Sequence, residues 1–89
     1  MNNPQHAHAI IPRKAFSTPA YNGDKARIYV PYSHASMPVC AFLDGMRANT
    51  LALKAQGGCR VWEFDASILI GIKVVLHSMG FEVEAIGAN

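Results

Sequence analysis

The chain has 89 residues, of which 51% are hydrophobic and 16% are charged, and its formal net charge is +2. This length suits one domain, and the charged fraction lies below the usual level of about 25%. Two cysteines are too few for the disulfide framework of a small secreted protein. The chain shows no secretory signal pattern and no apolar run near the ~20 residues that span a bilayer. We therefore expect a soluble cytoplasmic protein with no membrane partner.

The charges are unevenly distributed along the chain. Four of the eight basic residues but one of the six acidic residues lie within residues 1–27, which leaves residues 28–89 slightly acidic. A domain that binds nucleic acid usually carries a basic face of its own. The sequence therefore places electrostatic recognition mainly in the first 27 residues.

The first 25 residues predict a tail. They contain three of the five prolines and show no apolar repeat of either strand or helix period. We expect a flexible N-terminal tail over residues 1–25 and a single small α+β domain over residues 26–89. Ile10, Ile11 and Phe16 are apolar residues within this arm, and we expect them to contact a partner chain.

A strand and a helix are expected next. Residues 27–30 contain three β-forming residues in a row before Pro31, which indicates a short strand. A helix should begin near Pro38, with Ser36 as its cap. One apolar stripe at helical spacing would be buried, and it comprises Val39, Phe42, Leu43 and Met46.

Residues 49–55 allow two structures. Their alanine, leucine and lysine residues favour a helix, which Gly57 and Gly58 would end. The same two glycines could instead form the turn of a hairpin onto the following strand. We expect the helix, which leaves three strands in the sheet.

Residues 59–64 predict the second strand. Alternation puts Arg60, Trp62 and Phe64 on one face. Trp62 and Phe64 are the heaviest core candidates, because large aromatic side chains bury the most apolar surface.

The clearest helix follows, with Asp65 or Ser67 as its cap and Gly80 as its stop. Its core stripe comprises Ile68, Ile72, Val75, Leu76 and Met79. Residues 81–86 then alternate apolar and acidic side chains, which predicts a third strand with its apolar residues inward. The expected fold is α+β, with about three strands and two packed helices in the order β-α-β-α-β.

No residue set matches a known catalytic or metal-binding pattern. Cysteine and histidine residues that could act as a nucleophile and base, or bind zinc, come from separate predicted elements: His34, Cys40, Cys59 and His77. The glycine pair at 57–58 lacks the residues of a phosphate-binding loop. We expect no enzyme activity, no metal and no cofactor.

The second helix is apolar on more than one face. Beyond its core stripe it carries Ile70 and Val74, with Lys73 and His77 nearby. A surface helix normally shows one apolar stripe. Either this helix is covered on two sides within the domain, or it offers an apolar surface to another chain. We favour a partner-binding surface made of Ile70, Lys73, Val74 and His77, together with the tail.

A nucleic-acid interface is the alternative. Basic residues and aromatic rings are interleaved near the start of the chain, which suits phosphate contacts and base stacking. The candidate cations are Arg13, Lys14, Lys25, Arg27 and Arg60.

Residues 27–86 resemble the HARP domain found beside annealing helicases. The resemblance rests on residues 28–32, on the helix with Val39, Phe42 and Leu43, on residues 61–64 with their Trp-x-Phe pattern, and on the second helix. It implies a module that binds DNA structures, with Arg60 and Lys54 contacting phosphates. Residues 49–58 form a longer link than the family pattern has. The residues themselves favour a small non-enzymatic protein that binds another protein. We expect a regulator or inhibitor of the kind that phages and other mobile elements encode. Self-association is the other protein contact that we consider.

Overall fold

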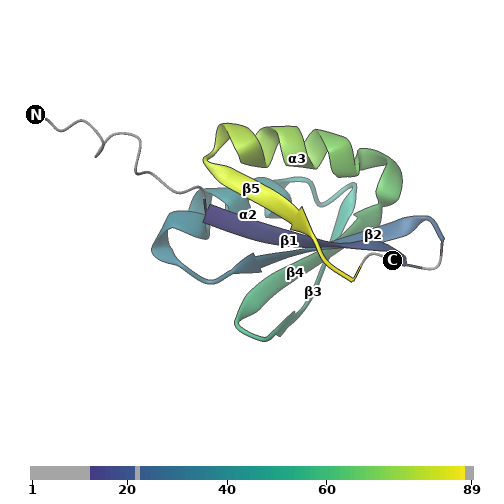
Figure 1. Ribbon diagram of the computed structural model, residues 1–89, viewed down its shortest axis with the longest axis horizontal. Coiled ribbons are helices and arrows are strands. Elements are labelled where there is room, and N and C mark those ends of the chain that lie inside the picture. Colours follow the sequence, from purple (N-terminus) through teal and green to yellow (C-terminus); the bar gives the residue numbers. More distant parts are fainter. Residues whose placement is uncertain (1–12, 22, 88–89) are drawn as a thin grey trace, which may run out of the picture.

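Figure 1 shows the computed structural model of the chain, which describes residues 13–21 and 23–87. Within these residues five strands form one sheet, and two α-helices pack against it. The strands are β1 (Arg13–Tyr21), β2 (Lys25–Pro31), β3 (Thr50–Gln56), β4 (Cys59–Asp65) and β5 (Phe81–Ala85). The helices are α2 (Met37–Gly45) and α3 (Leu69–Ser78), which follow the short 3-10 turns η1 (His34–Ser36) and η2 (Ala66–Ile68).

The strands lie in the order β3-β4-β2-β1-β5. The first four are joined by antiparallel pairings, whereas β5 pairs with β1 in parallel. A parallel neighbour needs a crossover connection, and α3 supplies it between β4 and β5. The strands β3 and β5 are therefore the two edges of the described sheet.

Both helices cover the same face of this sheet. One hydrophobic cluster joins residues of four strands to residues of α2 and α3, with Trp62 and Phe64 as its largest members. From the helices it includes Val39, Cys40, Leu43, Ile72 and Leu76. The predicted burial of Trp62 and Phe64 is confirmed. Two small residues of β1, Ala15 and Ser17, are also buried on this face.

No helix among the described residues covers the opposite face. There the register aligns Phe16 of β1, Tyr29 of β2, Val61 of β4 and Leu53 of β3 in one row across four strands. Val61 is only 1% exposed although it lies outside the main core cluster. Its neighbours in the row therefore shield it from water in place of a helix.

Hydroxyl groups fix the ends of the first helical segment. The Ser33 and Ser36 side chains each accept a hydrogen bond from the other residue's backbone amide, which forms a capping box at η1. At the other end, the Thr50 hydroxyl donates to the Leu43 and Met46 carbonyl oxygens, at 2.9 and 3.2 Å. Ser36 and Asp65 occupy the N-cap positions of α2 and η2, but neither side chain makes a capping hydrogen bond. The N-cap of α3 is Ile68, and not the expected Asp65 or Ser67.

Two expectations about secondary structure are wrong. Residues 50–56 form β3, which pairs with β4 through the Gly57-Gly58 turn, and not the expected helix. Both glycines have positive φ angles, +57° and +78°, which two-residue hairpin turns require. In addition, β1 lies inside the region expected to be a tail, so residues 13–21 belong to the sheet.

The class of the fold is α+β, as expected, but the sheet has five strands and not three. The order along the described residues is ββαββαβ, which differs from the expected β-α-β-α-β. The strands expected near residues 27–30, 59–64 and 81–86 are confirmed as β2, β4 and β5. Gly80, with a φ of +86°, follows the end of α3 as expected.

Candidate functional site

The helix α3 has one face in the core and one face in solvent. Ile72 and Leu76 are 1% and 0% exposed, whereas Ile70 and Val74 are 75% and 64% exposed. Ile70 and Val74 are four residues apart, so they lie one turn from each other on the same side of the helix. The second apolar face predicted from the sequence is therefore uncovered by any described residue.

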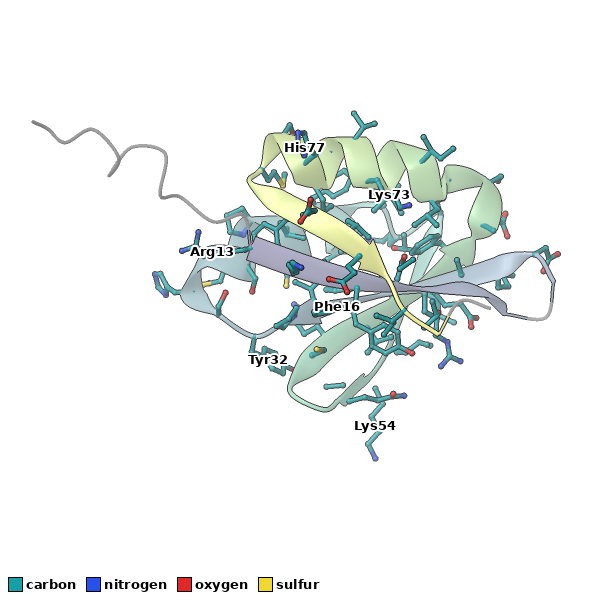
Figure 2. All side chains as sticks on the ribbon, in the orientation of Figure 1. Arg13, Phe16, Tyr32, Lys54, Lys73 and His77 are labelled. Carbon is teal, nitrogen blue, oxygen red and sulfur yellow. The ribbon has the colours of Figure 1, made fainter. Side chains whose placement is uncertain are left out.

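A groove runs between α3 and the edge strand β5. Its volume is about 270 Å³, and six residues line it: Lys73, Val74, His77, Phe81, Glu82 and Val83. We call it the α3–β5 groove. Three of the four residues predicted on the second helix line this groove, and Ile70 lies one turn before Val74. Figure 2 shows Lys73 and His77 on α3, above β5.

The backbone of β5 has one free edge within the described sheet. The Arg13 amide donates to the Gly80 carbonyl oxygen at 3.2 Å, and the Ile86 amide donates to the Ser17 carbonyl oxygen at 2.7 Å. Backbone groups alternate in direction along a strand, so the even-numbered residues of β5 face β1. The amide and carbonyl groups of Phe81, Val83 and Ala85 therefore point outward, beside the α3–β5 groove.

The other predicted partner-binding residues do not join this surface. Phe16 is half-buried on the face of the sheet that lies away from α3, as Figure 2 shows. Ile10 and Ile11 lie outside the described residues. The structure thus brings together the predicted residues of α3 and separates Phe16 from them.

Four of the five candidate nucleic-acid contacts are bound to carboxylates. The pairs are Lys14 with Glu84 at 2.9 Å, Lys25 with Asp65 at 2.7 Å, Arg27 with Glu63 at 3.2 Å and Arg60 with Asp44 at 3.0 Å. The hydrogen bonds and negative charges of Glu84 and Asp65 raise the pKa values of Lys14 and Lys25. Each of these cations therefore already contacts one carboxylate within the domain.

The same cations do not form one patch. Lys14, Lys25 and Arg27 belong to the open face, as their pairing partners on β4 and β5 show. Arg60 lies on the helix-covered side, where its guanidinium is 4.8 Å from the centre of the Trp62 ring and its pair Asp44 belongs to α2. Burial lowers the pKa of Arg60, but the hydrogen bond and charge of Asp44 outweigh it and leave this pKa raised.

The residues considered for catalysis and metal binding belong to four different elements, namely η1, α2, β4 and α3. Cys40 is buried in α2 and Cys59 is half-buried at the start of β4; both are free thiols. Within residues 13–21 and 23–87, no group of three or more histidine, cysteine or acidic side chains is placed to hold a metal ion. The described helices are also too short or too polar to cross a membrane.

The β5 side of the groove was not predicted from the sequence. Residues 81–86 were expected to form a strand with Phe81 and Val83 inward, but not to form a sheet edge beside the second helix. Only the order of the strands reveals that position, and no local pattern encodes it. No protein-family model, curated protein or solved structure matches this chain, so the site is defined by its geometry alone.

Proposed function

We propose that this domain is a non-enzymatic binding protein that recognises another protein, as a regulator or inhibitor, through the outer face of α3 and the α3–β5 groove. The observation that carries the proposal is the exposure of Ile70 and Val74, at 75% and 64%, one turn apart beside a groove. Exposed apolar groups that adjoin each other on a rigid element are typical of protein interfaces.

The electrostatics favour a protein partner over nucleic acid. Binding to phosphates depends on free cations, and Lys14, Lys25, Arg27 and Arg60 each already contact a carboxylate. The HARP-like resemblance, which implies DNA binding through Arg60 and Lys54, stays a prediction with less support. Asp44, Glu63 and Asp65 supply the carboxylates of three of these ion pairs.

The test is affinity purification of the tagged full chain from its source cells, with nuclease treatment, followed by mass spectrometry. We compare the wild type with the double variant Ile70→Asp/Val74→Glu and with Leu51→Asp, a control that changes a residue 60% exposed on β3. The proposal predicts one protein that is retained by the wild type and by Leu51→Asp and is lost from the double variant. Equal retention by all three, or material that nuclease removes, contradicts it.

A further inference from the structure

The position of the groove at a sheet edge indicates how a partner would bind. An extended peptide can add to an exposed edge strand, where backbone hydrogen bonds give affinity and pockets for alternate side chains give specificity. The strand β5 has outward-pointing amide and carbonyl groups at Phe81, Val83 and Ala85. The helix α3 runs alongside it (Figure 1), and its residues Lys73, Val74 and His77 form the opposite wall of the groove.

The side chains around this edge set different requirements for the two faces of an added strand. On the helix side, Val83 and Val74 offer apolar contact, and Val83 is packed partly against the core. On the open side, Glu82 and Glu84 are exposed and project from β5. Glu84 already contacts Lys14 at 2.9 Å, so among the described residues Glu82 is the β5 carboxylate without an ion pair. Neighbouring strands place their side chains opposite one another, so basic residues of an incoming strand would face these carboxylates.

The charges also argue against a second copy of the chain at this edge. Two β5 strands paired edge to edge would bring Glu82 and Glu84 of both copies close together, and among the described residues only Glu84 has a cation, Lys14, in an ion pair with it. Like charges opposite each other destabilise a strand pair. A segment with alternating apolar and basic residues meets both requirements without this repulsion.

Resting on the proposed function, we infer that the partner contributes an extended segment of alternating apolar and basic residues, which adds to the sheet as a strand beside β5. Its apolar side chains enter the α3–β5 groove over Val83 and against Val74. Its basic side chains lie beside Glu82 and Glu84. The chain thus recognises the segment by shape on one side and by charge on the other.

A direct test uses a fluorescent synthetic peptide of about seven residues, alternating valine and lysine, with blocked ends. Its affinity for the full chain is measured by anisotropy and compared with that of a valine–glutamate peptide. We expect the lysine peptide to bind at least tenfold more tightly. The variant Glu82→Lys/Glu84→Lys should reverse this preference. Absence of binding by the lysine peptide, or an unchanged preference in the variant, overturns the inference.

A second variant tests the backbone pairing. Ala85→Pro removes an outward amide but none that bonds β1, and proline is tolerated at such edge positions. We expect at least tenfold weaker peptide binding, whereas Ala85→Val, which keeps the amide, should retain it. Circular dichroism establishes that both variants are folded. If Ala85→Pro does not fold, the charge-reversal variant decides the question alone.

The same variants separate this inference from the proposed function. If a native partner is lost from Ile70→Asp/Val74→Glu but still binds Ala85→Pro, the proposed function stands and strand addition is wrong. If the partner binds both variants, the proposed function itself fails. Two other outcomes contradict the inferred partner chemistry. One is that the wild-type chain forms a dimer and Ala85→Pro abolishes it. The other is that the chain binds single-stranded DNA and does not bind the peptide.

Discussion

Ile70 and Ile72 stand two residues apart on α3, yet the helix places them in opposite environments. Ile72 packs into the core at 1% exposure, whereas Ile70 is 75% exposed. The residue type is the same, so the difference comes from position alone. It shows that α3 serves the fold with one face and leaves the other exposed to solvent. Substitutions on the two faces should therefore separate stability from binding.

The largest loss of stability should come from a substitution in the core between the helices and the sheet. Trp62 is 1% exposed and is the largest buried side chain. Trp62→Ala should cost about 3–5 kcal/mol in free energy of unfolding. This is a large part of the stability of a small domain, at about 0.05–0.15 kcal/mol per residue. Urea unfolding followed by circular dichroism measures it, with Tyr32→Ala at an exposed site as control. If Trp62→Ala unfolds at the same urea concentration as Tyr32→Ala, the assignment of Trp62 to the core is wrong.

Alanine substitution of Ile72 and of Ile70 tests the difference between the two faces of α3. Ile72→Ala should destabilise the domain by about 2–5 kcal/mol, because it leaves a cavity beneath α3. Ile70→Ala should change stability by no more than about 0.5 kcal/mol. Both values come from the same urea titration. Similar losses for the two variants would mean that the outer face of α3 is also covered.

A smaller effect is expected at Asp44, which lies on α2 and away from the groove. Its Oδ1 accepts a hydrogen bond from the indole nitrogen of Trp62 at 3.1 Å, and its carboxylate also pairs with Arg60. Asp44→Ala leaves the buried indole without this partner and should cost about 1–3 kcal/mol. Asp44→Asn keeps an acceptor and should cost less than about 1 kcal/mol. Neither change should alter partner or peptide binding in folded protein; a loss of binding would place the site elsewhere.

The sequence predicts the elements whose residues show a strong period. In β4 and at Ile72, Leu76 and Phe81, large apolar residues contact one core, so local pattern and burial agree. The pattern fails at the ends of α3 and β5, where Met79 is 39% exposed and Ala85 is exposed, although both were predicted to face the core.

In β1 the inward residues are Ala15, which is small, and Ser17, which is polar. Their burial shows no apolar period, and Pro19 argues against a strand. The sheet therefore contains a strand that its own sequence does not indicate.

The segment Thr50–Gln56 is a strand that the sequence also missed, but for a different reason. Its alanine, leucine and lysine residues favour a helix, but pairing with β4 through the Gly57-Gly58 turn outweighs that preference. The candidate site also contains residues that the sequence predicts and residues that it does not. Ile70, Lys73, Val74 and His77 could be predicted from the helical period, whereas Glu82 and Val83 join them only because β5 lies at the edge of the sheet.

The most direct test of the central claim is amide hydrogen exchange of the chain, measured residue by residue by NMR, free and bound to its partner. Strand addition at β5 predicts that the outward amides of Val83 and Ala85 become protected at least tenfold. The inward amides of Glu82 and Glu84, already bonded within the sheet, should change less. Protection confined to β3 or to the open face, with Val83 and Ala85 unchanged, would contradict the account.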